Sequence, residues 1–395
     1  MSKRILYVNT VRGGSHGRIA DDLAAAARDA GYETRFAYGR GPRSIDRIGG
    51  PIDGAAHLAA TRLLDAHGFA SARATRALIR RLRSDPPSLI HLHNIHGYYL
   101  HVGIFFEYLK SCGAPVIWTL HDCWAFTGHC SHFVRAHCER WKDGCHGCPM
   151  RGEYPASLFI DRSARNFSRK TRAFTRVPNL RVVAPSRWLA GLAGQSFLKD
   201  YPIEVIPNGV DLDAFTPPSD AKVNERPMML AVASPFDHRK GFIDTVSVAR
   251  SIPDADAVLV GLTSKQIEGL PKDSNIRGLR RTDSRDELIE LYRRADVLIN
   301  TTYEDTYPTV NMEAMACGAP VAAYDTGGCA EQITLDTGIL ARTGDTLGMA
   351  SAVRSLIARR RSETRAACRA HAESAFDRSA AARRYVDLYN LLTES

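Results

Sequence analysis

The chain alternates short apolar, β-branched runs with longer segments in which apolar residues recur every three or four positions. Runs of the first kind are typical of buried parallel strands, and segments of the second kind of the amphipathic helices that cover them. The first strand is predicted over 4–9, and the helix after it carries Ile19, Leu23 and Ala27 on one face. Further strands are predicted over 88–92, 115–120 and 180–184. The pattern predicts an α/β fold with a parallel sheet.

The alternation stops at the turn Pro207-Asn208-Gly209 and at a predicted linker over 215–220. It then restarts, with strands and helices predicted over 228–233, 241–251, 257–261, 284–294, 297–300, 308–316 and 320–323. We therefore predict a first Rossmann-like domain over 1–215 and a second over 216–375. The last segment, 376–395, is predicted to hold a helix that crosses back to the first domain. A cleft between two such domains is the expected ligand site.

Composition narrows the class of protein. With 395 residues, of which 44% are apolar, the chain is long enough for two globular domains and unlike disordered or fibrous proteins. The longest apolar run without a formal charge, 90–106, contains four histidines and is shorter than the ~20 residues of a membrane span. The apolar stretch at the N-terminus stops at Arg12, unlike a secretory signal. We expect a cytoplasmic protein whose thiols stay reduced.

The net charge of +9 comes from 52 Lys and Arg against 43 Asp and Glu. Most of the basic residues are arginines in helical patterns, clustered over 73–83, 162–176 and 359–361. Solvated helix faces explain these clusters simply. If they bind a partner instead, anionic lipid, nucleotides and nucleic acid are the candidates.

Two features of the first domain follow predicted strands. Gly13 and Gly14 open the first helix, where the backbone can approach a phosphate or a substrate, although a plain tight turn explains them equally well. Being adjacent, they do not match the G-x-G-x-x-G dinucleotide fingerprint. His121 follows the strand over 115–120, at the edge where open α/β sheets bind ligands, and histidines of the run 90–96 end another strand. His121 is as compatible with a structural role as with a chemical one.

A Gly-rich, aromatic loop over 123–150 holds four cysteines within 19 residues, namely Cys130, Cys138, Cys145 and Cys148. Four thiolates that close with C-x-x-C supply the tetrahedral sulfur set of structural zinc sites. A loop of this length also needs a staple. Free thiols are the alternative, and substitute ligands would be His129, His132 and His137. Four protein ligands leave no open position, so the predicted zinc is structural and not catalytic.

An acidic helix start is the main feature of the second domain. Pro308 suits the first turn of a helix, with Asp305 before it and Glu313 within it. Free backbone amides for an anion would be those of Thr309, Val310 and Asn311. The two carboxylates could then hold the hydroxyls of a sugar and of a ribose on either side of a diphosphate. Helix-capping charge is the alternative.

These features resemble the retaining family 4 glycosyltransferases of the GT-B fold, which use nucleotide-activated sugars. The resemblance covers nearly the whole chain, and the matching blocks follow one another in the family's order at 184–189, 206–211, Lys240-Gly241 and 305–321. The segment 119–122 together with the cysteine loop is similar to bacterial exopolysaccharide enzymes related to the colanic acid glycosyltransferases.

The resemblance assigns roles to residues of the second domain. Glu313 is identified as the carboxylate that holds the nucleotide ribose, and Lys240 as the diphosphate lysine. Asp305 takes the place of the first glutamate of the family's E-x7-E motif, which contacts the transferred sugar, and is one methylene shorter. The family's arginine, five residues before the lysine, is Pro235 here, so its role is left without a residue.

In the first domain, the resemblance places His121 near the reacting sugar and Gly14 close to the acceptor and the phosphate. It implies a hexosyltransferase that transfers a sugar with retention from a UDP- or GDP-sugar donor to a glycan or lipid-linked oligosaccharide, in exopolysaccharide synthesis. It also implies peripheral contact with the inner face of the cytoplasmic membrane, with the arginines of 73–83 as a contact surface, and catalysis without a metal. Asp211-Leu212-Asp213 spells D-x-D but lies before the linker and is not interpreted as a metal site.

Three other classes of protein fit part of the pattern. A GT-B sugar-nucleotide epimerase would share the architecture without an acceptor. A zinc-containing nucleic-acid-binding protein would explain the charge and the cysteines, but no basic helix or ordered aromatic array accompanies them. A catalytically idle scaffold of the same fold is the third.

Overall fold

The computed structural model describes residues 3–41, 47–218, 224–272 and 274–394. The chain divides into two compact units, Met1–Pro207 with Ala382–Ser395, and Asn208–Ala381. The division falls at Pro207, whereas the sequence placed it at 215. Of the predicted linker, Ser219 and Asp220 lie outside the described residues.

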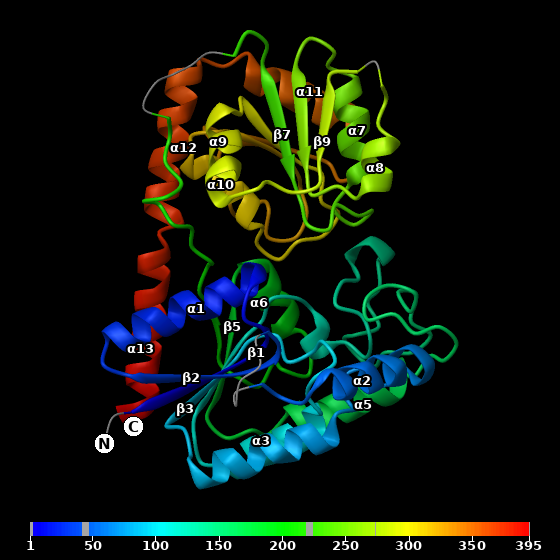
Figure 1. Cartoon of the computed structure of the whole chain (residues 1–395), viewed down its shortest axis with the longest axis vertical. Coiled ribbons are helices and arrows are strands. Elements are labelled where there is room, and N and C mark those ends of the chain that lie inside the picture. Colours follow the sequence, from blue (N-terminus) through cyan, green and yellow to red (C-terminus); the bar gives the residue numbers. More distant parts are fainter. Residues whose placement is uncertain (1–2, 42–46, 219–223, 273, 395) are drawn as a thin grey trace. The chain divides into compact units, whose positions relative to one another are not determined.

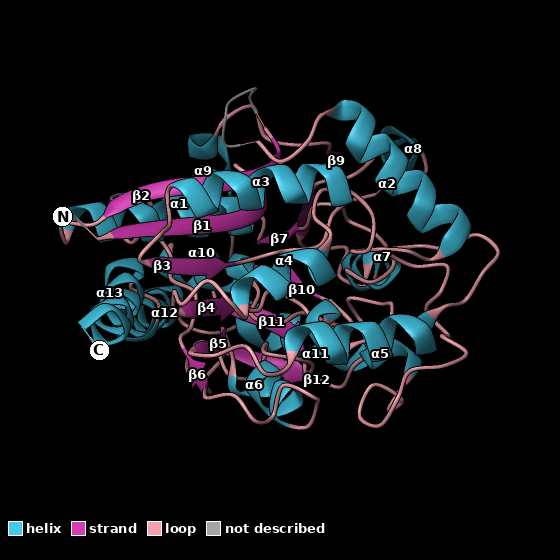
Figure 2. Cartoon of the chain, turned by 90° about the horizontal axis from the view of Figure 1, so that it is seen from below, coloured by secondary structure: helices cyan, strands magenta, loops and turns pink. Residues whose placement is uncertain are grey.

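The first unit contains a six-stranded parallel sheet in the order β2-β1-β3-β4-β5-β6, which can be followed in Figure 2. Its strands are β1 Arg4–Val11, β2 Glu33–Arg40, β3 Leu89–Leu92, β4 Val116–Thr119, β5 Leu180–Ala184 and β6 Ile203–Val205. Four of them were predicted from apolar runs. The second strand was missed because its first three residues are charged or polar.

Helices cover both faces of this sheet. Both faces carry apolar side chains, because alternate residues of a strand point to opposite sides. Ile5 and Tyr7 pack with α1 and α13, and Leu6 and Val8 with α3, α4, α5 and α6. Figure 1 shows α1 and α13 on one side of the sheet and α3 and α5 on the other. The helices are α1 Gly14–Asp29, α2 Pro51–Leu64, α3 Ala72–Ser84, α4 Val102–Leu109, α5 Ser163–Phe174, α6 Arg187–Gly194 and α13 Arg378–Glu394. Burial on both faces explains why the central strands read as continuous apolar runs.

The second unit repeats this architecture with a parallel sheet in the order β12-β11-β10-β7-β8-β9. Its strands are β7 Met228–Val232, β8 Asp256–Val260, β9 Ile276–Leu279, β10 Val297–Asn300, β11 Val321–Tyr324 and β12 Gly338–Ala341. One face packs against α9, α10 and α12, and the other against α7 and α11. The helices are α7 Phe242–Arg250, α8 Ser264–Glu268, α9 Arg285–Arg294, α10 Thr309–Ala316, α11 Thr346–Ile357 and α12 Arg361–Ala375. The prediction of two α/β units in tandem is confirmed.

The C-terminal helix α13 is bound to the first sheet by buried hydroxyl groups. The Tyr389 hydroxyl lies 2.8 Å from His91 Nδ1, and the Tyr385 hydroxyl lies 3.0 Å from Thr119 Oγ1. His91 Nε2 is in turn 2.8 Å from Thr119 Oγ1. Burial lowers the pKa of His91 to about 3, so this imidazole stays neutral. His91 is therefore part of the core that receives the helix. None of the described helices combines the length and the hydropathy needed to cross a bilayer.

The cysteine loop is anchored by a buried lysine. Lys170 of α5 is 1% exposed, and its Nζ donates to the carbonyls of Trp124 at 2.7 Å and Thr127 at 2.9 Å. It also lies 3.3 Å from the centre of the Trp124 ring, a cation–π contact. Trp124 begins a short 3-10 helix, Trp124–Phe126, and Phe126 packs against Trp141 within the core. The loop thus contributes its own aromatic residues to the hydrophobic core.

The expected structural zinc site is not supported. In the part of the chain that the structure describes, no group of three or more His, Cys, Asp or Glu side chains could hold a metal ion. Cys145 accepts a hydrogen bond from the Gly128 amide at 3.1 Å, and the interaction with Cys148 and burial together raise the pKa of the Cys130 thiol. Cys130, Cys138, Cys145 and Cys148 are free thiols. The buried aromatic side chains and the hydrogen bonds of Lys170 hold the loop against the core. The sequence led us to expect a metal in this role.

The burial of Lys170 predicts that the free energy of unfolding depends on pH. Burial lowers its pKa from 10.5 to about 7, against the opposing effect of the Cys145 and Cys130 thiols. Between these two pH values the unfolded chain binds the proton that the folded protein has released, so the free energy of unfolding rises with pH. We expect the stability of the wild type relative to Lys170→Met to increase as the pH rises from about 7 to about 9.5. Urea titrations at several pH values measure this difference.

The control for this prediction is Lys199→Met, which removes an exposed lysine of the same unit. A stability difference between wild type and Lys170→Met that stays constant over this pH range would contradict the prediction.

Candidate functional site

Each sheet has one point at which the strand order reverses. In the first unit the chain passes from β1 outward to β2 and then returns to place β3 on the other side of β1. Ligands of open α/β sheets bind outside the carboxyl ends of the strands at such a point. The end of β1 meets the segment that follows β3 there, because the Thr10 hydroxyl donates to the Asn94 carbonyl at 2.9 Å.

A cavity of about 190 Å³ lies at this edge, at the carboxyl ends of β3 and β4. Two pairs of side chains from the two strand ends meet in its lining. His93 Nδ1 lies 3.0 Å from His121 Nε2, and His96 Nε2 lies 2.9 Å from Asp122 Oδ2. Trp124 completes this side of the lining. The structure therefore brings His121 together with other polar groups, as its place in the sequence predicted.

Asp122 is held as an anion in this lining. Burial alone would raise its pKa, but the electrostatic interaction and the hydrogen bond with His96 outweigh burial, and the Trp124 amide adds a hydrogen bond to Oδ1 at 2.9 Å. The pKa of Asp122 is consequently held well below its usual value. The cavity thus presents a fixed negative charge beside His121.

Gly14 begins α1 directly after β1, as the sequence predicted. Its φ of +70° lies in the left-handed region, which favours glycine, and a Cβ there would meet no atom within 4 Å. The requirement for glycine is therefore conformational, and the space beside Gly14 is open to a ligand.

In the second unit the strand order reverses between β7 and β10. Lys240 lies in the segment after β7, and Asp305 in the segment after β10, so the two flank the reversal. Lys240 Nζ donates to Asp305 Oδ2 in an ion pair, with 20% and 17% of the respective side chains exposed. The structure thus joins two residues that are 65 positions apart in the sequence.

Gly241 makes this approach of the two segments possible. Its φ is +73°, and a Cβ on it would lie 2.0 Å from the Thr301 carbonyl oxygen. Any side chain there would force apart the segments that carry Lys240 and Asp305.

The helix α10 lies next to the ion pair. Buried amide side chains fix the position of its first turn. The Asn311 side chain is 0% exposed, accepts from Asn300 Nδ2 at 2.9 Å and donates to Gln332 Oε1 at 3.0 Å. Gln332 Nε2 then donates to the Pro308 carbonyl at 3.1 Å. Of the three predicted donor-binding residues here, Asn311 can contribute only its backbone, whereas Thr309 and Val310 are partly exposed.

Glu313 is positioned by a residue that the sequence reasoning missed. The hydroxyl of Tyr292, which is 0% exposed, donates to Glu313 Oε2 at 2.8 Å. A Tyr in an amphipathic helix such as α9 has the sequence pattern of an ordinary core residue. No sequence signal therefore distinguishes Tyr292 from a residue that only packs. The interaction fixes the carboxylate on the first turns of α10.

A second missed feature is the pair Gly327-Gly328 after β11. A Cβ on Gly327 would lie 1.9 Å from the Asp305 carbonyl oxygen, and the Gly328 amide donates to the same oxygen at 3.0 Å. Adjacent glycines after a predicted strand mark such a close approach, and this signal was available in the sequence.

Arg239 precedes Lys240 in the sequence. Its Nη1 donates to the Glu304 carbonyl at 2.9 Å, which places the guanidinium in the support of the loop that carries Asp305.

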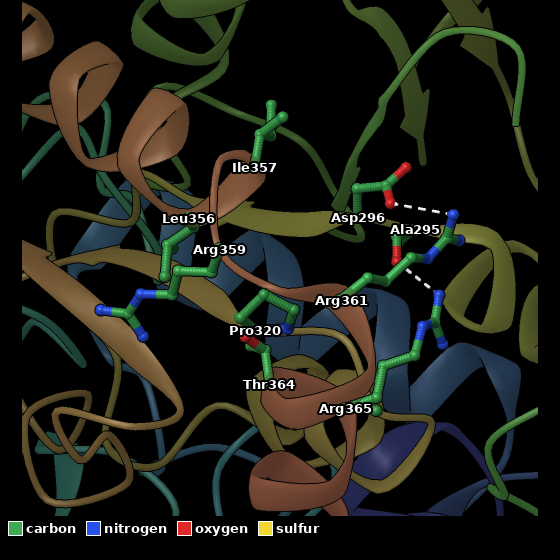
Figure 3. A pocket seen from close by; sticks show the side chains of 10 residues that line it. Ala295, Asp296, Pro320, Leu356, Ile357, Arg359, Arg361, Thr364 and Arg365 are labelled. Carbon is green, nitrogen blue, oxygen red and sulfur yellow. Dashed lines mark hydrogen bonds and ion pairs between the residues drawn. The ribbon is translucent and has the colours of Figure 1, made fainter. Parts of the chain in front are cut away.

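A second cavity, of about 270 Å³, lies at the opposite edge of this sheet, beside the residues that precede β10 and β11 (Figure 3). Arg361 Nη1 lies 3.2 Å from Asp296 Oδ1, and Arg365 Nη2 donates to the Ala295 carbonyl at 3.2 Å. Arg359 Nη1 donates to the Leu335 carbonyl at 3.0 Å. These arginines, from the cluster 359–361 and its neighbour, connect helix and strand ends, so we assign them to the fold.

Replacing Gly241 by Ala tests how closely the two site segments must approach. We expect Gly241→Ala to destabilise the protein by roughly 1–3 kcal/mol, because it adds strain at a positive φ and a clash with Thr301. Gly191→Ala is the matched control, since a Cβ at Gly191 meets no atom within 4 Å. Denaturant unfolding of both variants provides the measurement, and equal stabilities would contradict the structural argument.

Two family models match this chain, one on either side of residue 215. Residues 16–214 match the family model described as Glycosyltransferase Family 4, and residues 216–375 match that described as Glycosyl transferases group 1. WcaC of Escherichia coli K12, assigned as a colanic acid biosynthesis glycosyl transferase, is 28% identical over 80% of this chain and 81% of its own. A D-inositol 3-phosphate glycosyltransferase of Mycobacterium sp. (strain JLS) is 30% identical over 43% of each chain.

Solved structures resemble the whole chain. Sucrose-phosphate synthase from Thermosynechococcus elongatus has a TM-score of 0.74 at 18% identity, with 99% of each chain covered. HepE of Anabaena in complex with UDP-glucose has a TM-score of 0.68 at 16% identity, with 98% of this chain and 99% of that chain covered. These similarities confirm the predicted GT-B fold. The chain belongs to the glycosyltransferases, with a Glycosyltransferase Family 4 region followed by a group 1 region.

Proposed function

We propose that this glycosyltransferase transfers a sugar, with retention of configuration, from a UDP- or GDP-sugar to a glycan or lipid-linked oligosaccharide in exopolysaccharide synthesis. The second unit binds the donor through Lys240, Asp305, Glu313 and the first turn of α10. The first unit receives the acceptor near Gly14 and His121. The bound UDP-glucose of HepE and the pathway of WcaC support the donor class and the process.

The ion pair between Lys240 and Asp305 is the observation that carries this proposal. It lies at the strand reversal of the second sheet, where this class of fold binds ligands, and next to the N-terminal turn of α10. A cation beside free backbone amides suits a diphosphate, and a carboxylate suits the hydroxyls of a sugar. Lys240 and Asp305 therefore match the two halves of a nucleotide-sugar at its reacting bond.

The transfer requires stabilisation of charge more than covalent chemistry. As the bond between sugar and diphosphate breaks, negative charge develops on the leaving diphosphate and positive charge on the sugar. One cation about 4 Å from a phosphate oxygen contributes on the order of 4 kcal/mol at an effective dielectric constant of 20. Lys240 and the amides of α10 supply this stabilisation from fixed positions. The acceptor hydroxyl then attacks from the side that the diphosphate leaves, which retains the configuration.

Asp211, within the D-x-D sequence, supports catalysis without a metal at that position. Its Oδ2 lies 3.0 Å from Arg285 Nη2 and 3.5 Å from Arg378 Nη2, so two guanidinium groups neutralise the carboxylate. The contacts join three segments of the second unit, and we assign Asp211 to the fold.

The helix α3 is the proposed contact with anionic lipid at the inner face of the cytoplasmic membrane. Leu78, Ile79 and Leu82 are buried on one of its faces. The exposed arginines of the helix are Arg73, Arg76, Arg80 and Arg83. Such a basic surface would hold the protein near a membrane-bound acceptor.

Binding of nucleotide sugars tests the proposed function without an acceptor. Isothermal titration with a panel of UDP- and GDP-sugars is expected to identify a donor, and NMR of the products with an acceptor glycan is expected to show a retained anomeric configuration. A changed sugar without any acceptor would indicate an epimerase instead. Absence of binding to every donor would indicate a catalytically idle scaffold.

Substitutions of Lys240 and of Asp305 are expected to have opposite effects on nucleotide binding. Lys240→Ala should lower turnover on the order of 10²- to 10³-fold and weaken the binding of UDP, because it removes the ~4 kcal/mol cation. Asp305→Asn should bind UDP at least as tightly as the wild type, because the anion that competes for Lys240 is gone, while sugar transfer falls.

The control for both variants is Lys265→Ala, which removes an exposed lysine of the same unit. Normal turnover by Lys240→Ala on a matched donor and acceptor would refute the assignment of this lysine.

A further inference from the structure

We propose that Tyr154, which follows the cysteine loop, is a positioning residue for sugar transfer: its hydroxyl orients His96, and His96 orients the Asp122 carboxylate in the cavity of the first unit. The proposal rests on the proposed function, because it concerns the same reaction. None of the sequence motifs assigned a role to Tyr154, His96 or Asp122.

Three interactions connect Tyr154 to the cavity. The Tyr154 hydroxyl lies 3.0 Å from His96 Nδ1, and His96 Nε2 lies 2.9 Å from Asp122 Oδ2. The other carboxylate oxygen accepts from the Trp124 amide at 2.9 Å. Asp122 is therefore held at both oxygens, and one of its two supports depends on the orientation of the His96 ring.

The chemistry of the three groups sets the direction of each hydrogen bond. The Asp122 carboxylate is ionised and can only accept, so His96 Nε2 carries a proton and donates it. In neutral His96 the other nitrogen, Nδ1, has no proton and accepts from the Tyr154 hydroxyl. The carboxylate therefore selects the Nε2–H tautomer of His96, and the Tyr154 hydroxyl holds the ring at the nitrogen that this tautomer leaves as an acceptor. Without this hydroxyl, Nδ1 loses its hydrogen bond, and the ring can turn about its bond to Asp122.

The cavity is where this orientation matters for the reaction. Asp122 and His121 are neighbours in the chain, and both line the cavity with His96 and His93. A carboxylate with both oxygens fixed can accept hydroxyl groups of a sugar only in a defined direction. We infer that the direction set by His96 positions a sugar hydroxyl beside His121.

The geometry of Tyr154 fits a supporting role. The residue as a whole is 44% exposed, whereas its hydroxyl points to His96, which is 8% exposed. Its backbone is held by the segment that follows Asp122, because the Ser131 hydroxyl donates to the Tyr154 carbonyl at 3.5 Å. The packing of the cysteine-rich segment onto the core, through Trp124 and Lys170, thus also places Tyr154 at the cavity.

The variant Tyr154→Phe removes the hydroxyl and keeps the ring. We expect kcat for sugar transfer to fall about tenfold, as for a displaced catalytic geometry, with an unchanged melting temperature. The affinity for UDP should stay the same, because the donor residues belong to the second unit. Nitrogen-15 NMR of histidine-labelled protein should show the proton of His96 on Nε2 in both proteins and a shifted Nδ1 signal in the variant, because this nitrogen loses its hydrogen bond.

The matched control is Tyr98→Phe, which removes the hydroxyl of a neighbouring ring whose centre lies 6.3 Å from that of Tyr154. This control is expected to keep both the turnover and the His96 signals of the wild type.

Two results would overturn the proposal. One is a Tyr154→Phe variant that transfers sugar at the rate of the wild type, and the other is an unchanged Nδ1 signal of His96 in that variant. If the wild type itself transfers no sugar, the proposed function fails, and the Nδ1 measurement still decides whether Tyr154 orients His96.

Discussion

Burial of both faces of two parallel sheets is the constraint on which the rest of this structure depends. Parallel strands need crossover helices, and the helices leave only the strand ends accessible. All carboxyl ends of one sheet then meet at the same edge, and the reversal of strand order opens a crevice there. Lys240 and Asp305 in one unit, and His121 and Asp122 in the other, reach their positions through this arrangement.

Polar groups at these edges are fixed by partners behind them. The first turn of α10 is fixed by the amide chain of Asn300, Asn311 and Gln332, and Glu313 by the hydroxyl of Tyr292. Asp122 is fixed by His96 and a backbone amide. Because each side chain is oriented before a ligand arrives, binding does not have to pay for ordering it.

The cysteine-rich segment shows how a long irregular loop can be held without a metal ligand set. Trp124, Phe126 and Trp141 are buried in the core of the first unit, so the loop contributes apolar burial of its own. Lys170 donates hydrogen bonds to two backbone carbonyls of this segment. Burial lowers the pKa of this ammonium to about 7, so its hydrogen bonds and ring contact offset only part of the cost of burying the cation.

Apolar periodicity was enough to predict two α/β units and most of their central strands, because strands buried on both faces leave a strong pattern. The order of the motifs around Lys240 and 305–321 was enough to indicate the family. The partners of the site residues needed the folded chain: Tyr292 and Tyr154 have no local signal, since their roles come from contacts between distant segments. The cysteine spacing predicted a zinc site that the described residues do not support, because spacing counts possible ligands, whereas a metal site needs their side chains to converge in the folded loop.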